Sequence, residues 1–470
     1  MAAASFLVAI GFGVIGPAIP LLAAHFGVSA ALAGLAISAF AAFRFLSALA
    51  GGRLVRAVGE RAVMTGGLLL QAVTSILAGL APTFPLLIAF RSIGGIGSAA
   101  FTVSSIALVI RIAPEQQRGR AMGIYQGGFI LGSIAGPGLG GLLAEISLRL
   151  PLVVYGIFLL LAAIVSATML RTPAVPRRDR ARTESALAEQ VAEAVLAEPA
   201  IPGEALADAA LADTAPVDAA LGDAALGDAA LGDAPLGDGV HGDAELGDTA
   251  QGDAVLARPR CPAAGRSDGP LRTALRSRAY LAALLANLGV GWVFYGMRSS
   301  LLPLYISRHL GQSAGWTGLA FLLSALVQAL ALLRAGRICD TWGRRPALLL
   351  GAGVSILSVA AFTLPISPGV FLLPLLSLGV GGALLATAPG ALVGDVAVGR
   401  SETIIALFAM VSDFGGIAGP LISGWLTDAV SYAAAFWLAC AILASGFVMT
   451  LTIGRGRRPD RVTDAAAASL

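Results

Sequence analysis

The stretch GIYQGGFILGSIAGPGLGG at residues 123–141 holds eight glycines and one proline in nineteen residues, inside a long apolar run. Glycine and proline are the least favourable residues for a helix interior in water. In lipid the balance differs, because small residues let helix backbones approach closely and neighbouring helices satisfy the carbonyl that a proline frees. The stretch therefore indicates a membrane-spanning helix with a tightly packed face.

The composition of the whole chain agrees with a membrane protein. Of the 470 residues 57% are hydrophobic and only 13% are charged, which is far more apolar than a soluble domain needs. Apolar runs recur near the length of ~20 residues that crosses a bilayer, and the alternating pattern of an outer-membrane barrel is absent. We therefore predict an all-α integral membrane protein with twelve spans, near residues 4–24, 31–52, 63–82, 86–111, 121–144, 150–170, 280–306, 314–335, 346–366, 369–393, 403–426 and 432–453.

The arginines predict how the chain is oriented. The sequence has no lysine, so its 31 basic residues are all arginine, and they gather in every second connection, in the central segment and in the tail. Because arginine-rich connections stay in the cytoplasm, we expect both termini there, in the cell membrane of a bacterium. The first span starts almost at Met1 and lacks a basic n-region, so it does not resemble a cleaved signal peptide. Whether Met1 is the true start stays open.

Residues 171–278 interrupt the apolar spans. Aspartate recurs every five residues in this segment, ten times from Asp208 to Asp253, and residues 181–256 carry a net charge of −15. The residue order does not fit a pentapeptide solenoid, and the glycine pattern of a calcium-binding repeat is absent. Small and acidic residues without aromatics cannot bury a core. We expect a disordered cytoplasmic linker that makes weak electrostatic contact with the basic face beside it.

Without that segment the sequence contains an internal repeat. AGGRLVRAVGERA at residues 50–62 parallels RAGRICDTWGRRPA at residues 334–347, so that Gly52 and Gly59 correspond to Gly336 and Gly343. IAGP at residues 134–137 recurs at residues 417–420. Since each copy holds six spans, both copies have the same orientation and form a parallel repeat around a central cavity. The expected organisation is a six-helix bundle at 1–170, the linker at 171–278, a second bundle at 279–453 and a tail at 454–470.

These features resemble the major facilitator superfamily, and within it the twelve-helix drug:proton antiporters. GRICDTWGRR at 336–345 is similar to the family motif between helices 2 and 3, and RSIGGIGSAA at 91–100 is similar to its helix-4 motif. The antiporter signature on helix 5 has its counterparts in Gly123, Gly132, Gly136, Pro137, Gly140 and Gly141. The resemblance implies a proton-coupled transporter that works by alternating access. It also implies that these helix-5 residues form a gate, packed against helix 8 of the opposite half.

A cytoplasmic latch is also implied by the resemblance. Its residues would be Gly52, Arg56, Gly59 and Glu60 in the first half and Gly336, Asp340, Gly343, Arg344 and Arg345 in the second. Arg56 stands where the family has an acid and Glu60 where it has a base, so the first-half pair is inverted. We expect Arg56 to pair with Asp395 or Glu402, Glu60 to face Arg400, and Asp340 to face Arg118 or Arg120. A decayed first-half motif with a solvated Arg56 is the alternative.

Charges within the spans are costly and mark candidate sites. Four lie deep in the expected helices, namely Arg44, Arg91, Arg298 and Asp413. The resemblance assigns the position of Arg91 to proton handling, and Asp413 is the deepest carboxylate, so these two are the candidates for proton coupling. A structural brace is the alternative for each charge. Substrate-cavity candidates are Arg44, Tyr125, Gln126, Asn287, Tyr295, Arg298 and Gln328.

The most specific functional hypothesis is efflux of a small amphipathic compound coupled to protons. Three arginines and one carboxylate favour a neutral or anionic substrate, and the acid that many cation exporters carry on helix 1 is missing. A proton-coupled uptake symporter for metabolites or sugars is the alternative, although RTPAVPRRD at 171–179 differs from the sugar-porter signature. No catalytic constellation, cofactor motif, metal-ligand spacing or nucleic-acid motif is apparent. We expect a monomer whose partners are substrate, protons and lipid, and we expect no enzyme activity.

Overall fold

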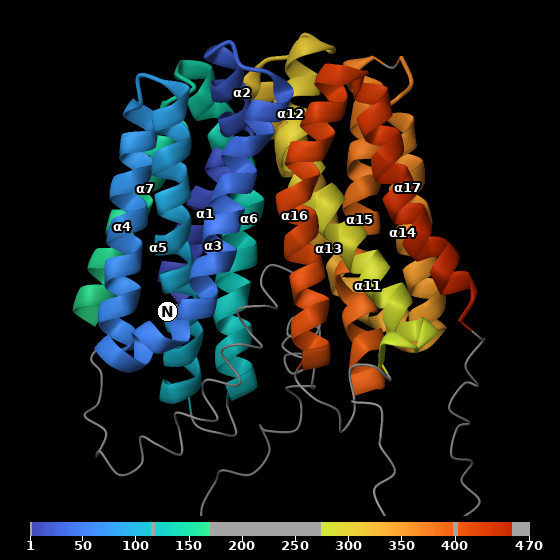
Figure 1. Ribbon diagram of the computed structural model, residues 1–470, viewed down its shortest axis with the longest axis horizontal. Coiled ribbons are helices and arrows are strands. Elements are labelled where there is room, and N and C mark those ends of the chain that lie inside the picture. The colour runs from blue at the N-terminus through green and yellow to red at the C-terminus, as the bar shows by residue number, and fades with distance from the viewer. Residues whose placement is uncertain (1, 114–117, 170–273, 366, 398–402, 454–470) are drawn as a thin grey trace, which may run out of the picture.

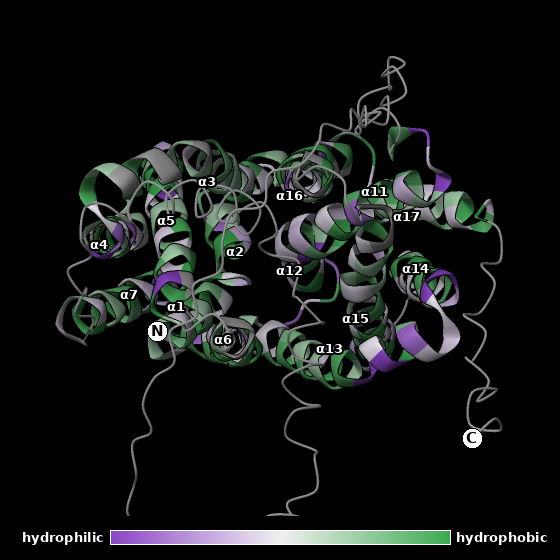
Figure 2. Ribbon diagram, turned by 90° about the horizontal axis from the view of Figure 1, so that it is seen from below, coloured by the Kyte–Doolittle hydropathy of each residue, from purple (hydrophilic) through white to green (hydrophobic). Residues whose placement is uncertain are grey.

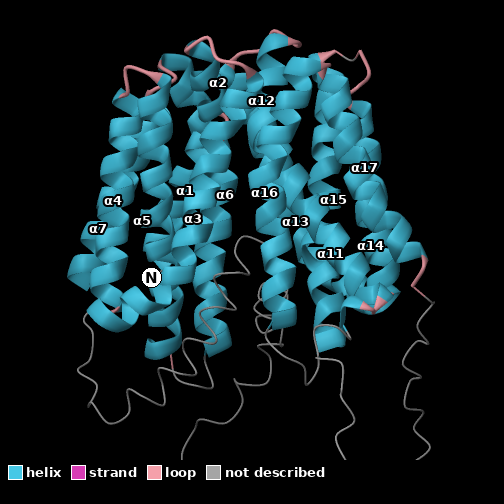
Figure 3. Ribbon diagram, viewed as in Figure 1, coloured by secondary structure: helices cyan, strands magenta, loops and turns pink. Residues whose placement is uncertain are grey.

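The computed structural model describes residues 2–113, 118–169, 274–365, 367–397 and 403–453 (Figure 1). Over these residues the chain is helical, with short turns and no strand (Figure 3). Within this described part, twelve stretches are long and apolar enough to cross a membrane. They match the predicted spans closely, which confirms the all-α membrane fold.

The first half of the chain contributes six of these spans, the first of which is broken into two helices. The break lies at Gly16 and Pro17, where proline lacks the amide proton that would continue the helical hydrogen bonds. The helices are α1 (Ala2–Ile15), α2 (Ala18–His25), α3 (Ala30–Val58), α4 (Glu60–Leu80), α5 (Phe84–Ile112), α6 (Arg118–Ile146) and α7 (Leu150–Met169).

The second half repeats this arrangement, and its first span contains a wide π-helical segment instead of a break. The elements are α11 (Arg278–Val290), η3 (Gly291–Met297), α12 (Arg298–Arg308), α13 (Ala314–Trp342), α14 (Arg344–Ala361), α15 (Pro368–Ala397), α16 (Thr403–Ala429) and α17 (Tyr432–Leu451). Residues 171–273 of the predicted linker lie outside the described part of the chain, whereas Ala274, also within its predicted limits, is fully buried in the core of the second half. The proposed domain limits stay a prediction.

Equivalent residues form the ends of equivalent helices in the two halves. Ser29 and Ser313 cap α3 and α13 by accepting a hydrogen bond from the third amide of each helix, those of Leu32 and Trp316. The same two helices end at Gly59 and Gly343, whose φ angles of +93° and +94° favour glycine. The internal repeat read from the sequence is therefore a structural repeat.

The two groups of helices lie side by side (Figures 1 and 2). Each has its own core, built around Tyr155 and Phe101 in the first half and around packed aromatic rings in the second, such as Phe362 and Phe371, whose centroids are 4.8 Å apart. Many large apolar side chains point outward, among them Leu131, which is 63% exposed, so the outer surface suits contact with lipid. The halves meet mainly through α3 with α16, α6 with α13, and α2 with α12.

We call the end that carries the connections at 26–29, 81–83, 147–149, 309–313, 362–365 and 430–431 the upper end, as it is drawn in Figure 1. The lower end carries the glycine turns at Gly59 and Gly343 and the ends of α7 and α11 that face the central segment. Four hydrogen bonds join α3 or α13 to the opposite half in the upper part of the bundle. The bundle is thus held together near its upper end.

Candidate functional site

Arg91 is the most deeply buried of the predicted membrane charges. It lies on α5 with 5% of its surface exposed, and its guanidinium carbon is 4.3 Å from the centroid of the Phe40 ring on α3. Its Nε donates no hydrogen bond within the described part of the chain. Close by, Gln71 donates a 2.6 Å hydrogen bond to the hydroxyl of Tyr155. A cation over an aromatic face is stabilised by the ring quadrupole, so Phe40 holds Arg91 inside the first half.

Arg298 and Gln328 were predicted as cavity residues and are brought together. Arg298 is the first residue of α12, directly after the π-helical segment, and its Nη1 donates to Oε1 of Gln328 on α13 at 3.1 Å. Its guanidinium carbon also lies 5.5 Å from the centroid of the Phe321 ring on the same helix. Arg298 is half-buried in the middle of its span. Within the described residues these two partners are neutral, so neither of them offsets the positive charge that Arg298 brings into the bundle.

Arg44 and Asp413 are both half-buried and occupy helices that pack on each other, α3 and α16. Asp413 follows Ser412, whose carbonyl lies against Gly291 at the start of the π-helical segment. Arg44 lies one turn below Phe40, at the point where α5 crosses α3 through Gly95. Each of these charges therefore lies beside a helix crossing within its own half, α3 with α5 for Arg44 and α16 with η3 for Asp413.

Two of the predicted cavity residues are packed away instead. Asn287 is 2% exposed, and its Nδ2 donates a 2.7 Å hydrogen bond to the carbonyl of Phe408, which ties α11 to α16 within the second half. Tyr125 is 1% exposed and packs against Ile106 and Val109 of α5. In this structure both side chains face neighbouring helices, and their place in a substrate cavity stays a prediction. Gln126 and Tyr295 are half-buried.

The glycines of the helix-5 signature divide into two faces. Gly132, Gly136 and Gly140 lie against α1, in the same half: a methyl group at Gly136 would approach the Cα of Gly13 to 2.5 Å. Gly141 instead faces α13 of the opposite half, where a methyl group would lie 2.7 Å from the Cα of Gly318. The expected contact with helix 8 is thus made by Gly141, whereas Gly132, Gly136 and Gly140 hold the first half together. The surroundings of Gly123 are outside the description.

Pro137 lies within α6 and contacts both of these seams. Its ring approaches Gly13 of α1, and its carbonyl oxygen approaches Gly318 of α13. The second half repeats the pattern, because Gly419 and Pro420 lie against Gly296 of the π-helical segment, and the carbonyl of Pro420 approaches Gly34 of α3. Each Gly-Pro pair therefore lies where three helices meet. These are α1, α6 and α13 for Pro137, and η3, α16 and α3 for Pro420.

At the lower end, Glu60 of the expected latch has a partner that the sequence did not indicate. Glu60 accepts hydrogen bonds of 3.0 and 2.9 Å from Nη1 of Arg111, at the neighbouring end of α5. The carboxylate of Glu60 is thus satisfied within the first half. Arg400 is outside the described residues, so the expected pairing of Glu60 with Arg400 stays a prediction. Arg344 and Arg345 donate to the carbonyls of Ala391 and of Thr450 and Leu451, within the second half.

The other latch pairings stay predictions. The side chains of Arg56, Asp395, Arg118 and Arg120 are outside the description, and so is the whole of Glu402. Asp340 is exposed on the last turn of α13. For the remaining glycines of the motif, Gly336 lies within α13 and Gly52 within α3.

Two functional candidates escaped the sequence reading, namely Glu145 and Asp428. Each stands at the upper end of a helix and accepts backbone hydrogen bonds from the first turn of a helix in the opposite half. Acids at span ends are ordinary interfacial residues, so their type gave no signal. Their spacing gave a signal, because the interval between Glu145 and Asp428 equals the interval between the two IAGP segments.

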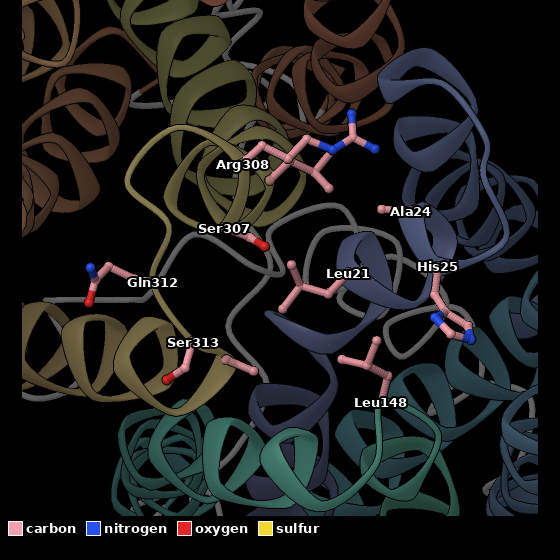
Figure 4. A pocket seen from close by; sticks show the side chains of 10 residues that line it. Leu21, Ala24, His25, Leu148, Ser307, Arg308, Gln312 and Ser313 are labelled. Atoms are coloured by element: carbon pink, nitrogen blue, oxygen red, sulfur yellow. The ribbon is translucent and has the colours of Figure 1, made fainter.

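A small hollow of about 290 Å³ opens at the upper end between the halves (Figure 4). His25 of α2 and Arg308 of α12 are among the residues around it, together with Leu21, Leu148, Ser307 and Gln312. It lies at the end of the spans and is at the small limit of ligand pockets. The hollow therefore lies above the contact between the two halves and away from Arg91 and Arg298.

The model of the Major Facilitator Superfamily matches residues 1–301 and 284–469 of the chain, and so covers both halves. The chain belongs to this superfamily. Membership agrees with the multi-pass membrane fold that the sequence predicts.

Curated superfamily members resemble part of the chain. Multidrug resistance protein 1 of Bacillus subtilis is 32% identical over 168 residues, and quinolone resistance protein NorA of Staphylococcus aureus is 29% identical over the same length. Each match covers 36% of this chain and 43% of the relative, so it spans less than half of either protein.

Solved superfamily structures match nearly the whole fold. The human organic anion transporter MFSD10 superposes with a TM-score of 0.56 at 18% identity, over 96% of this chain and 97% of that one. A bacterial homologue of the human lysosomal transporter Spinster, in an inward-facing and unoccupied conformation, gives 0.62 at 16% identity, over 96% and 91%. At such identities the likeness shows the shared fold alone.

Proposed function

We propose that this superfamily member exports a small amphipathic compound, neutral or anionic, in exchange for protons. The observation that carries the proposal is the helix-5 signature, which resembles that of the antiporters and lies at the junction of α1, α6 and α13. A junction built from backbone contacts excludes side chains and water, so it separates the two sides of the membrane when closed. The relatives named for multidrug and quinolone resistance support export over uptake.

The upper end is proposed to face the outside of a bacterial cell, with both termini in the cytoplasm. The arginine-rich connections lie at the lower end, as the positive-inside rule requires of cytoplasmic loops. With this orientation the structure is closed toward the outside. Substrate would then enter from the cytoplasm and leave when the upper seam opens. A single chain holds both halves, so one copy suffices for the transport path.

The charges inside the bundle support the proposed choice of substrate. Arg298 reaches the centre of its span with Gln328 and Phe321 beside it, and this combination offers a cation, an amide and an aromatic face to an amphipathic anion. An excess of positive charge in the spans, three arginines against one carboxylate, disfavours a cationic guest by like-charge repulsion. Asp413 is the proposed proton carrier, because a carboxylate in a span changes protonation as its surroundings change. Arg91, Arg44, Tyr295 and Gln126 are the other proposed contributors.

Transport in everted membrane vesicles tests this function. Three fluorescent amphiphiles of similar size, one anionic, one neutral and one cationic, are offered while the lumen is acidified. We expect the anionic or neutral probe to accumulate, and we expect a protonophore to abolish the accumulation. Vesicles without the protein are the control. Accumulation of the cation alone, or movement of every probe in the opposite direction, contradicts the proposal.

A further inference from the structure

Two carboxylates cross between the halves at the upper end. Oε1 of Glu145, at the end of α6, accepts a 2.8 Å hydrogen bond from the backbone amide of Gly315 in α13. Asp428, at the end of α16, accepts hydrogen bonds from the amides of Ala30 and Ala31 in α3, at 2.9 and 2.8 Å. In both places an acid of one half lies on the first turn of a helix in the other half.

The two contacts are copies of one arrangement. Glu145 and Asp428 occupy equivalent positions of the internal repeat, and each stands one helical turn after a glycine, Gly141 or Gly424. Residues one turn apart share a helix face, so the glycine and the acid of each pair contact the same partner helix. A methyl group at Gly424 would lie 2.5 Å from the carbonyl oxygen of Ala30. The glycine thus brings the backbones together and the acid takes up the free amides one turn farther on.

The amides in question have no partner within their own helix. The first turn of every helix leaves its amide protons unsatisfied, and the summed peptide dipoles add a partial positive charge there. An ionised carboxylate accepts hydrogen bonds from these amides and is also attracted by the partial positive charge. It is therefore held more strongly than a neutral acceptor would be. The stabilisation exists only while the halves touch at the upper end.

The serine caps allow these contacts to break without loss of helix. Ser29 and Ser313 accept a hydrogen bond from the third amide of α3 and α13 within their own half, while the acids bind amides of the first two residues. When an acid withdraws, the serine still caps the helix and water reaches the exposed amides. The arrangement has the properties of a reversible contact.

We propose that Glu145 and Asp428 form a paired lock that favours the state closed at the upper end, so that losing either charge shifts the protein toward the state open there. The proposal rests on the alternating access of the proposed function but not on substrate identity. A brace that only stabilised folding would lie within one half, as the pair of Glu60 and Arg111 does. Each of these acids instead joins elements of different halves.

Distance measurements between spin labels test the lock. Cys339 and Cys440 are replaced by alanine and Cys261 by serine, and labels are placed at Thr83 and Leu364, exposed at the upper ends of the first and second halves. The full chain in lipid nanodiscs, without substrate, is compared with Glu145→Gln, Asp428→Asn and the double variant. We expect each single change to raise the ratio of long to short distances roughly threefold to tenfold, and the double change to multiply the two effects.

The matched control is Ser147→Ala. Ser147 follows α6 at the same end and accepts a hydrogen bond from the amide of Arg149 within the first half, so the distance distribution should not change. Glu145→Asp keeps the charge and should stay nearer the parent distribution than Glu145→Gln. Unchanged distances in the double variant, or a lower melting temperature with unchanged distances, overturn the lock. Because no substrate is present, failure of the lock leaves the export proposal standing, and failure of export leaves the lock standing.

Discussion

Glu60 and Arg111 form an ion pair at the lower ends of α4 and α5, in which Nη1 of Arg111 donates to both carboxylate oxygens and the side-chain exposures are 9% and 23%. The repeat that relates Gly59 to Gly343 also relates Glu60 to Arg344 and Arg111 to Asp395. The charges at these four positions are therefore exchanged between the halves. Glu60, which departs from the family motif, is thus paired with the basic Arg111 at the position where the second half has the acidic Asp395.

This pair should contribute to the stability of the first half. Glu60→Gln or Arg111→Gln leaves a largely buried charge without its partner, so we expect the free energy of unfolding to fall by about 1–3 kcal/mol. Combining Glu60→Arg with Arg111→Asp copies the second-half charges and should recover most of the loss. Melting temperatures in detergent check both effects. No recovery in the double variant would show that the pairing geometry, and not charge balance, controls this site.

The two faces of α6 should respond differently to bulk. Gly136→Leu pushes α1 away inside the first half, so we expect a large loss of folded protein in the membrane. Gly141→Leu meets α13 of the opposite half first, so the protein should fold while the contact between α6 and α13 fails to close and transport is lost. Gly127→Ala is the control, since a methyl group there meets nothing within 4 Å. Folded yield and vesicle transport separate the cases, and equal yields for both leucine variants would contradict the division.

Arg298 should determine which substrates are accepted. Arg298→Gln removes the central cation, and we expect the KM for an anionic probe to rise about tenfold to hundredfold while that for a neutral probe changes little. Arg298→Lys keeps the charge but loses the planar donor group. Its KM for the anionic probe should therefore lie between those of the parent and of Arg298→Gln. The readout is the ratio of the two KM values, which a general loss of protein does not change. Parallel losses for both probes would place Arg298 in the framework instead.

Asp413 should carry the coupling to protons. Asp413→Asn removes the titratable group, so we expect transport driven by a pH gradient to disappear while exchange of labelled for unlabelled substrate continues. Both are measured in the same proteoliposomes. Asp413→Glu keeps a carboxylate and should retain part of the driven transport. Gradient-driven transport at the parental level in the asparagine variant would exclude Asp413 as the carrier.

The acidic segment should be dispensable for transport. Replacing residues 204–255 with a flexible polar linker of equal length removes all ten periodic aspartates, but the contacts of α3 with α16 and of α6 with α13 remain. We therefore expect transport within about twofold of the parent, in vesicles with matched protein levels. A complete loss with normal insertion would assign the acidic repeat a role beyond connection.

The spans could be predicted from the sequence because hydrophobic length decides them. The repeat was equally accessible, since Gly59 and Gly343 keep the same conformation and the same place in the two copies. Side-chain direction was not accessible. Asn287 and Gln328 are both polar residues in spans, but one is tied to a backbone carbonyl and the other meets Arg298, and only the packing of α11 and α13 distinguishes them.

Pairings were predicted less well than positions. Glu60 was expected to bind across the halves and instead binds Arg111, which the sequence offered only as an arginine near a span end. The helix-5 signature located a glycine seam but not its division between α1 and α13, because one short motif serves both faces. The proline break after Gly16 in the first span could have been read from residues 16–17.

The π-helical segment Gly291–Met297 gives its span a place where the chain length can change. A π turn holds one residue more than an α turn, so losing a single residue there lets the segment close toward regular α form while α11 and α12 keep their facing. Elsewhere in the span the same deletion would rotate every later side chain by about 100° about the helix axis, and Arg298 would leave Gln328. A deletion of one residue can therefore be tolerated at this segment in evolution without redirecting the charge of Arg298.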